Sequence, residues 1–220
     1  MINVVFGVFN GSSGGGGGFT PAYYTPTSFT GGWGSPENAY DGTGVAQGSN
    51  TGTTTNPANE QFESTSSEVV ETYSFASLTG FSQIQINGSF NFDLTSAATQ
   101  YLAGSGDPEI IPPQYVKGTA QFLVQVSTNG GDSGGTWTTI ELRNKNTSGN
   151  VGGNSSGSAQ PFNSTINSGS AIALPANLSS LKIRLISKVF AQGYRNSDGN
   201  LYEATGLSEN QVYDMTVYLS

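Results

Sequence analysis

The chain has 220 residues, of which 35% are hydrophobic, 11% aromatic and only 10% charged, and its formal net charge is −8. The absence of Cys and His excludes disulfide frameworks, cysteine-ligated zinc sites and catalytic triads that use a histidine base. The length suits one large all-β domain with an extended segment, and the aromatic content is enough for a core. This composition is therefore not that of an acidic disordered chain.

The charges are unevenly distributed. Residues 1–116 contain nine acids and no base, whereas residues 117–220 contain all seven bases and six acids, so the two segments carry −9 and +1 and sum to −8. Binding to nucleic acid or to an anionic membrane needs Lys and Arg side chains. No apolar run approaches the roughly 20 residues of a membrane span. We therefore expect neither a nucleic acid nor a membrane partner. The acids are either solvated or complementary to a basic partner.

The N-terminal residues predict an extended segment. The stretch from Ile2 to Phe9 has no basic residue and its apolar run is broken by Gly7, so it does not resemble a secretory signal. We expect a protein made in a cytoplasm and not exported by the usual route, in which this stretch pairs with another chain or with a sheet edge. Residues 14–18 are five consecutive glycines, the most flexible composition available.

Residues 1–67 are rich in Gly, Thr, Ser and Asn, and their prolines keep them out of helix. They predict an extended Gly-rich N-terminal arm that lies on another surface and uses isolated aromatic residues as anchors. The candidate protein-contact residues are Val4, Phe6, Phe9, Phe19, Tyr23 and Tyr24.

Residues 68–220 carry the strand signals. A strand is expected at 68–75, and the range 83–94 places its apolar residues on even positions and polar residues between them, the period of a half-buried strand. The range 115–142 predicts a long hairpin, because two alternating runs flank a Gly- and Asn-rich turn at 128–135.

The remaining segments follow in chain order. Residues 95–102 are compatible with one or two helical turns, and 144–165 resemble a polar loop. Strands are expected at 170–174, from Leu181 to about Phe190, and at 212–219, with an Asp-Gly turn at 196–200. Roughly eight strands with polar turns and no helical period predict an all-β, jelly-roll-like β-sandwich over residues 68–220.

Two short stretches carry a family resemblance. Residues 35–42 (Ser-Pro-Glu-Asn-Ala-Tyr-Asp-Gly) resemble the turn that opens discoidin-like and galactose-binding-like sandwich domains. Residues 125–131 with 136–140 resemble a hairpin of the same superfamily. The resemblance covers about 20 residues and implies structural roles: Asn38 and Asp41 order a turn, and Trp137 packs under the sheet. The chain lacks the Cys pair and the Arg-rich floor of many members.

The Gly-rich arm, the polar Ser, Thr and Asn loops and the absence of Cys also resemble structural proteins of tailed bacteriophages. This resemblance implies a head decoration (cement) protein or a tail or fibre module. It would be located in the virion, bind capsid or tail proteins, and form a homo-oligomer, for which we expect a trimer.

No residue pattern predicts catalysis or a cofactor. The glycine run lacks the Lys and following helix of a phosphate-binding loop. Neither Glu68 with Glu71 nor Asp107 with Glu109 has an apolar frame that would make a catalytic pair. Calcium binding at Asp41 or Asp198 is less expected than ordinary turn formation, so we expect no metal site. Aromatic residues that could stack on sugars are Trp33, Tyr23, Tyr24 and Tyr194, but anchoring in the core or in an interface is the more common role of such residues.

Two functions remain open. The first is a non-enzymatic viral structural protein that binds and stabilises a phage particle surface through its arm and sandwich. The alternative is a carbohydrate-binding or host-adhesion module of a tail fibre. A hydrolase is disfavoured because no nucleophile–base pair can be assembled without His or Cys, except through carboxylates or Lys.

Overall fold

The computed structural model describes residues 22–24, 26–41, 44–54, 57–75, 78–79, 82–101, 111, 115–131, 135–148, 153–167, 170, 172, 174, 177–178 and 180–219. Within these ranges one helical turn, α1 (Asn38–Asp41), accompanies twelve strands. The strands are β1 (Ala22–Tyr24), β2 (Ser28–Gly31), β3 (Ala46–Thr53), β4 (Gln61–Ser74), β5 (Leu78–Thr79), β6 (Gln83–Tyr101), β7 (Lys117–Ser127), β8 (Thr138–Ser148), β9 (Gly153–Asn167), β10 (Asn177–Leu178), β11 (Lys182–Arg195) and β12 (Leu201–Leu219).

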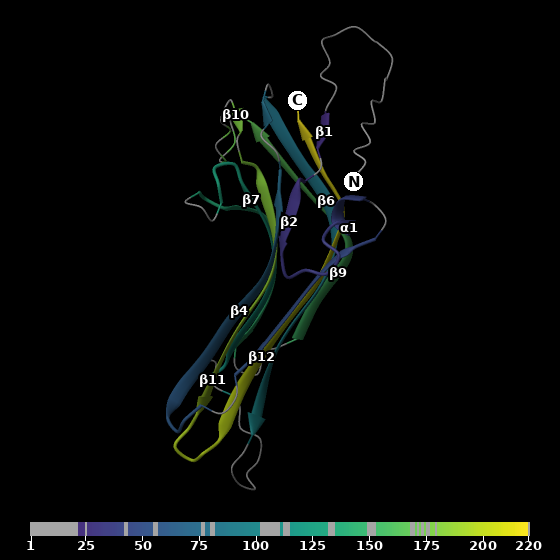
Figure 1. Ribbon diagram of the computed structural model, residues 1–220. Helices are drawn as coiled ribbons and strands as arrows, with labels where there is room; N and C mark the ends of the chain where they lie inside the picture. Colours follow the sequence, from purple (N-terminus) through teal and green to yellow (C-terminus); the bar gives the residue numbers. More distant parts are fainter. Residues whose placement is uncertain are drawn as a thin grey trace.

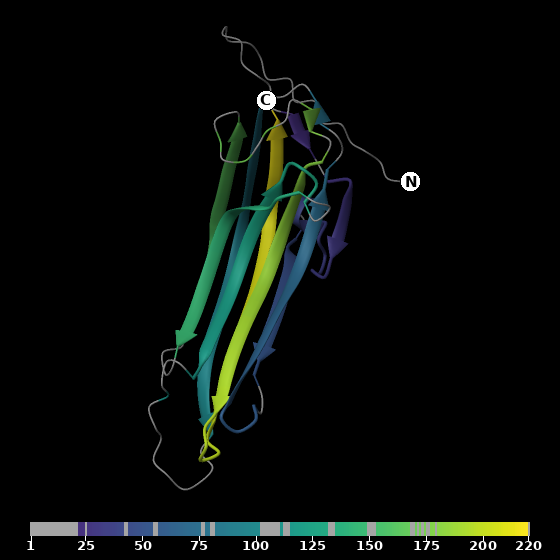
Figure 2. The same ribbon diagram turned by 90° about the vertical axis from the view of Figure 1, so that its left-hand side faces the viewer.

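The strands form a two-layer sandwich. One layer has the order β3–β12–β6–β9 and the other β4–β11–β7–β8, and all the pairings are antiparallel. The layers are joined at the β11–β12 hairpin, where Tyr194 pairs with Tyr202 and Arg195 with Leu201. Figure 1 shows this hairpin at the lower end of an elongated molecule, and Figure 2 looks onto the layer that contains β11 and β4.

The path of the chain through the layers is that of a jelly roll. Eight strands, β3, β4, β6, β7, β8, β9, β11 and β12, alternate between the two layers in sequence order, except for the β7–β8 hairpin, which stays in one layer. Two four-stranded sheets connected in this way define the double-sheet jelly roll. The prediction of an all-β, jelly-roll-like sandwich is therefore confirmed.

Strand alternation positions the side chains as the sequence indicates. In β6, Ile84, Ile86, Phe90 and Leu94 are fully buried between the layers, as their even positions predict. The predicted hairpin at 115–142 is also present, with β7 and β8 paired along their length and one bulge after Val124.

Three local predictions are wrong. Residues 95–101 continue β6 and are not helical, because β6 pairs along them with β12. Most of the expected loop at 144–165 is strand: β8 extends to Ser148, and β9 begins at Gly153 and pairs with β6. Pairing with a neighbour overrides the weak strand propensity of Ser, Asn and Gly. In the segment expected to form a strand at 170–174, the described residues, 170, 172 and 174, are not in one.

The division into an arm (1–67) and a sandwich (68–220) stays a prediction. Within the part that the structure describes, β3 pairs with β12, and β4 runs unbroken across position 67 while pairing with β11. Trp33 and Ala46 are buried in the main core. Residues on the N-terminal side of the predicted boundary therefore contribute all of β3 and the first half of β4 to the jelly roll.

The interior differs along the length of the sandwich. One half, here called the aromatic half, is filled by large rings: Phe90 lies 5.0 Å from Phe122 and 6.3 Å from Phe162 between ring centroids, and Trp33 is 6.2 Å from Phe122. Toward the β11–β12 hairpin, the thin half has glycines on its inner surfaces: Gly52, Gly118, Gly193 and Gly206. A Cβ atom built on Gly206 of β12 would lie 3.1 Å from the Thr119 carbonyl oxygen of β7, so the two backbones approach closely.

A buried polar cluster joins the layers between the two halves. The Asn50 amide of β3 donates to the carbonyl oxygens of Ser67 (2.9 Å) and Ser187 (3.0 Å) in the opposite layer. The Asn210 amide of β12 donates to the hydroxyls of Ser187 (2.7 Å) and Ser208 (2.8 Å). The Ser208 hydroxyl in turn donates to the Gln121 carbonyl oxygen at 2.7 Å. These bonds satisfy the amide donors of Asn50 and Asn210 and the hydroxyl donor of Ser208, whose side chains are buried.

Candidate functional site

The outer surface of the β3–β12–β6–β9 layer is polar and acidic, and we call it the acidic face. Its outward side chains form cross-strand rows: Glu209 lies opposite Ser49 on one side and Asp93 on the other. Gln211 lies in the next row, opposite Gln47 and Asn91. The four strands contain four acids, Asp93, Glu203, Glu209 and Asp214, and no Lys or Arg. The layer therefore carries −4 on its strands.

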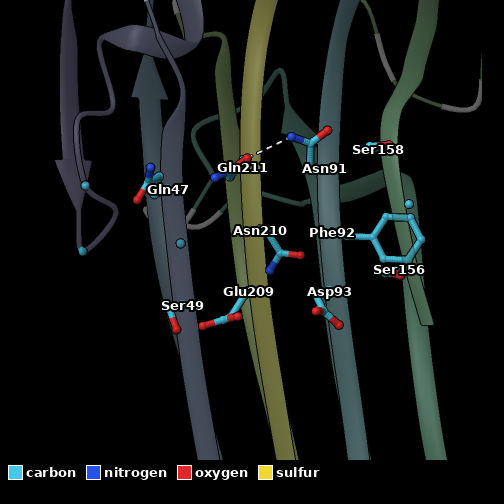
Figure 3. A pocket seen from close by; sticks show the side chains of 14 residues that line it. Gln47, Ser49, Asn91, Phe92, Asp93, Ser156, Ser158, Glu209, Asn210 and Gln211 are labelled. Atoms are coloured by element: carbon cyan, nitrogen blue, oxygen red, sulfur yellow. Dashed lines mark hydrogen bonds between the residues drawn. The ribbon is translucent and has the colours of Figure 1, made fainter. Parts of the chain in front are cut away.

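A hollow of about 980 Å³ lies on this face, and Figure 3 shows the residues around it. Its lining is made of amide, carboxylate and hydroxyl side chains, one phenylalanine, and glycines that leave space between them: Gly32, Gly34, Gln47, Gly48, Ser49, Asn91, Phe92, Asp93, Ser156, Gly157, Ser158, Glu209, Asn210 and Gln211. The Asn91 amide donates to Gln211 Oε1 at 2.8 Å, and Asn91 Oδ1 accepts the Ala159 N–H at 2.9 Å. These bonds hold Asn91 in one orientation.

Asp93 and Glu209 are opposite each other on neighbouring strands at the hollow, and the Glu209 side chain is turned toward Ser49 (Figure 3). Like charges directly opposite each other across a strand pair are unfavourable. Among the described residues neither carboxylate has an ion pair. The arrangement suits a ligand that brings positive charge or several hydroxyl groups, because carboxylates and amides are the side chains that accept hydrogen bonds from such groups.

The outer surface of the β4–β11–β7–β8 layer carries positive charge, in contrast to the acidic face, and we call it the basic face. All seven Lys and Arg residues of the chain lie in β7, β8 and β11: Lys117, Arg143, Lys145, Lys182, Arg184, Lys188 and Arg195. Four of them, Lys117, Lys182, Arg184 and Lys188, are on the outward phase of their strands, whereas the Arg143 guanidinium lies over the Phe90 and Phe92 rings of the opposite layer. The layer's strands also contain four acids, Glu63, Glu68, Glu71 and Glu141, so they carry 7 − 4 = +3.

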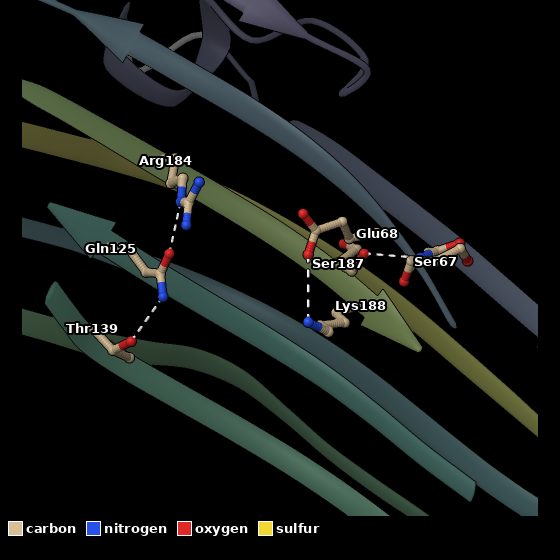
Figure 4. A network of polar contacts seen from close by, with 8 residues as sticks. Ser67, Glu68, Gln125, Thr139, Arg184, Ser187 and Lys188 are labelled. Carbon is tan, nitrogen blue, oxygen red and sulfur yellow. Dashed lines mark hydrogen bonds and ion pairs between the residues drawn. The ribbon is translucent and has the colours of Figure 1, made fainter. Parts of the chain in front are cut away.

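Polar contacts and one apolar row organise the basic face. Arg184 Nε donates to Gln125 Oε1 at 2.6 Å, and Lys188 Nζ lies 3.5 Å from Glu68 Oε2. Figure 4 shows both contacts on this layer. The Arg184 guanidinium lies 4.2 Å from the centre of the Trp137 ring, a cation–π contact. Between these groups an apolar row crosses four strands, and its members pair in the order Val70, Ile186, Leu123 and Leu142.

Aromatic rings stack near the β11–β12 hairpin. The Phe62 ring, 54% exposed, lies 4.7 Å from the Tyr194 ring, and Tyr194 stacks on Tyr115 at 4.4 Å. Tyr194, a predicted sugar-stacking residue, thus belongs to an aromatic stack. Trp33, predicted for the same role, is 5% exposed, and its indole N–H donates to the Val69 carbonyl oxygen. Burial makes Trp33 a core residue, in line with the expected role of core anchoring, and removes it as a sugar-stacking residue.

One acid lies inside the sandwich. Glu71 is 2% exposed, and burial raises the pKa of its carboxyl group. The Trp33 backbone N–H donates to Glu71 Oε2 at 3.2 Å and partly offsets this increase, whereas the negative charge of Glu37 adds to it. Burial also raises the pKa of Tyr73, whose hydroxyl donates to the Pro36 carbonyl oxygen. Both groups attach the segment before β3 to β4.

The predicted contact residues are only partly placed. Val4, Phe6, Phe9 and Phe19 lie outside the described residues. Tyr23 and Tyr24 lie in β1, whose backbone pairs with Tyr218 and Val217 of β12 in the same chain. The prediction that these six residues contact another protein stays a prediction.

The turn and metal predictions are placed more fully. Asp41 ends α1, and Asp198 lies in the predicted turn, which Gly199 closes by donating to the Asn196 carbonyl oxygen. In the ranges that the structure describes, no three His, Cys, Asp or Glu residues are grouped for a metal ion, and no helix is long and apolar enough to cross a membrane. Trp137 lies half-buried against Arg184 rather than among the core residues beneath the sheet.

Sequence reasoning did not find the pair of carboxylates at the hollow. The alternation in 83–94 placed Asp93 on the wet face, but Glu209 fell outside the predicted last strand, which begins at Leu201 and not at Val212. The signal that could have been used is the alternation before Val212, in which Glu209 occupies a polar position. Extending the last strand back through Glu209 would have placed this residue on an outward face like Asp93.

The chain matches no family model and no curated protein. Among solved structures it is similar to one of the infectious bursal disease virus Gx strain, with 11% sequence identity and a TM-score of 0.24 over 79% of this chain and 39% of that chain. A structure of the VP2 subviral particle of infectious bursal disease virus has 15% identity and a TM-score of 0.12, and 75% of this chain and 41% of that chain are covered. The chain thus spans about two fifths of the chains it matches, and likenesses this weak carry no argument about function.

Proposed function

We propose that this chain is a non-enzymatic virion structural protein that binds and stabilises the surface of a viral particle. The observation that carries the proposal is the jelly-roll order of its eight strands. Double-sheet jelly rolls recur in viral capsid proteins and lectins, and this support is an analogy at the level of the fold. The absence of His and Cys from the sequence agrees with a role that involves no reaction.

We further propose that the particle is a tailed bacteriophage, that the protein decorates its capsid as a cement protein, and that it does so as a homo-oligomer, which we take to be a trimer. The resemblance in composition supports this finer assignment. The part of residues 1–67 outside the sandwich strands would act as the arm, with Val4, Phe6 and Phe9 adding apolar contacts to a neighbour's surface. Extended strands bind by adding main-chain hydrogen bonds to a sheet edge, and several weak contacts together raise the effective affinity.

Mass spectrometry of purified particles tests this proposal. We expect the intact chain to copurify with capsid or tail proteins in a fixed ratio to them. Deleting residues 1–20 should abolish binding of the purified protein to particles while its circular dichroism remains that of a β-protein. A truncated chain that still occupies every site would contradict the role of the arm, and absence of the chain from all particles would contradict the proposed function.

The hollow on the acidic face favours a second candidate function, a carbohydrate-binding or host-adhesion module. Its amide and carboxylate groups suit the hydroxyls of a sugar. A glycan array should then show saturable binding, and replacing Asn91 and Gln211 together by Ala should weaken it about tenfold or more, since each lost hydrogen bond is worth about 0.5–1.5 kcal/mol. Asn146→Ala, on the exposed side of β8, is the matched control. An array without binding would remove this candidate.

A further inference from the structure

We propose that the basic face of one copy of this chain docks on the acidic face of a second copy. The inference deepens the proposed function, because it names the surfaces by which copies would assemble, and it rests on that function only for the expectation of a homo-oligomer. Since the two faces are different surfaces, the contact is heterologous: repeated contacts of this kind close into a ring or extend into an array.

The first argument is the separation of charge between the layers. Every base of the chain lies in the strands of one layer, and the strands of the other layer have acids alone, giving +3 and −4. Strand alternation turns Lys117, Lys188 and Arg184 outward on the basic face, and Asp93, Glu203 and Glu209 outward on the acidic face. Solubility requires surface charge but does not require acids and bases to lie on separate faces. Faces of opposite charge, in contrast, steer and orient the docking of two molecules.

The second argument is the apolar content of the basic face. Among the residues that the structure describes, three large hydrophobic side chains are exposed, and two of them lie on this face: Leu142 (42%) and Phe62 (54%). Leu142 ends the apolar row that begins at Val70, and Phe62 ends the aromatic stack on Tyr194. Aromatic and aliphatic anchors surrounded by polar residues are typical of protein interfaces.

The third argument is the hollow on the acidic face. Asp93 and Glu209 stand as uncompensated neighbours at a cavity large enough for side chains of a second molecule. A Lys or Arg of the partner would relieve their repulsion, and the basic face supplies these groups. Four strands about 4.8 Å apart and about 40 Å long present roughly 800 Å², which is the area each partner buries in a standard interface.

The arrangement also explains how copies with a net charge of −8 can associate. At about 0.1 M salt the Debye length is about 10 Å, so the acids on the far side of each molecule are largely screened at the contact. Two sheets packed face to face lie about 10 Å apart, so the opposite charges of the two faces meet within that distance.

Two charge-reversal variants of the full chain test the proposal by sedimentation velocity. The first changes the basic face (Lys117→Glu with Lys188→Glu), and the second the acidic face (Asp93→Lys with Glu209→Lys). The wild type should self-associate, and each variant alone should sediment as a monomer. Mixed in equal amounts, the variants should associate again, because the first retains an intact acidic face and the second an intact basic face.

Matched controls are Lys145→Glu, at the β8 edge, and Asp198→Lys, in the β11–β12 turn, which should associate like the wild type. Circular dichroism verifies that all variants fold. A wild type that stays monomeric up to about 0.5 mM, well above a weak Kd of about 0.1 mM, would overturn the proposal. So would variants that associate normally or a mixture that stays monomeric.

The test also separates this inference from the proposed function. If a monomeric wild type binds particles, the proposed function holds and this inference fails. If the wild type self-associates but does not bind particles, this inference holds and the proposed function fails.

Discussion

The aromatic half and the thin half of the sandwich fill the space between the two layers with residues of very different size. In the aromatic half, rings such as Phe90 and Phe122 fill the space between the layers. In the thin half, glycines remove side chains so that backbone faces backbone, as at Gly118 and Gly206. A smaller cluster, Ile111, Val116, Ala191, Tyr202 and Ala204, completes that end.

The difference shows that one fold can be stabilised by large buried side chains in one region and by close approach of the two sheets in another. Burial of apolar area is the main favourable term in the aromatic half, where each large side chain contributes roughly 1.5–3 kcal/mol. In the thin half, less apolar area is available, and stability depends on the absence of Cβ atoms. The buried polar cluster around Ser187 joins the layers where the two halves meet. Substitutions should therefore act by different mechanisms in the two halves.

The largest effect is expected in the aromatic half. Phe122→Ala should lower the free energy of unfolding by about 3–5 kcal/mol, because it removes a fully buried ring that contacts Phe90 and Trp33. Urea unfolding followed by tryptophan fluorescence measures the loss. Phe62→Ala, which truncates a ring that is 54% exposed, is the control and should cost below about 1 kcal/mol. Equal losses in the two variants would remove the distinction between core and surface rings.

In the thin half, adding a single methyl group should be harmful. A Cβ atom on Gly193 would lie 2.5 Å from the Tyr202 carbonyl oxygen and 2.7 Å from Thr54 Oγ1, so Gly193→Ala forces the backbones apart. We expect a loss of about 1–3 kcal/mol in urea unfolding. Gly34→Ala is the matched control, since only the Gln47 carbonyl oxygen, 3.9 Å away, lies near its Cβ position. A neutral Gly193→Ala would show that the layers can separate freely.

The polar cluster between the halves should show an intermediate effect. Asn50→Ala leaves the carbonyl oxygens of Ser67 and Ser187 without their amide donor. We expect a loss of about 1–2 kcal/mol, at the low end for unpaired buried groups because Ser67 is accessible to water. Asn146→Ala, an exposed position, should be nearly neutral when measured in the same way. A neutral Asn50→Ala would mean that water replaces the amide at little cost.

The aromatic half was more predictable from the sequence than the thin half. Alternation of Ile84, Ile86 and Phe90 identified β6, since large apolar residues at period two mark a buried face. Beyond Leu94 the same strand continues through Thr, Ser and Ala, which carry no such contrast. Small residues can line a buried face only because the opposite layer approaches closely, and a single sequence does not show that approach.

The candidate site was less predictable still. The uneven distribution of charge along the chain was visible, but its meaning depends on the strand order, which puts β7, β8 and β11 in one layer and β6 and β12 in the other. Asp93 and Glu209 are neighbours through that order alone. Jelly-roll pairings join segments far apart in sequence, so local patterns cannot assign them.

The smallest expected effect concerns Glu71, the acid buried beside Trp33 in the aromatic half. Because burial raises the pKa of Glu71 in the folded state above its ordinary value of 4.5, the folded protein binds the proton more tightly than the unfolded chain does. Stability contributed by this group is therefore present at low pH and lost as the pH rises through the raised pKa. Glu71→Gln keeps an acceptor for the Trp33 N–H and carries no charge, so it should be more stable than the wild type at pH 7.

Thermal unfolding at a series of pH values measures this difference, which should shrink to nothing as the pH falls below about 4.5, where both side chains are neutral. Glu68→Gln removes a carboxylate from the exposed side of the same strand and accounts for the change in net charge. If Glu71→Gln were instead less stable at pH 7 than at pH 4 relative to the wild type, the ionised carboxylate would be the stabilising form. The hydrogen bond from Trp33, and not burial, would then be the dominant influence on this group.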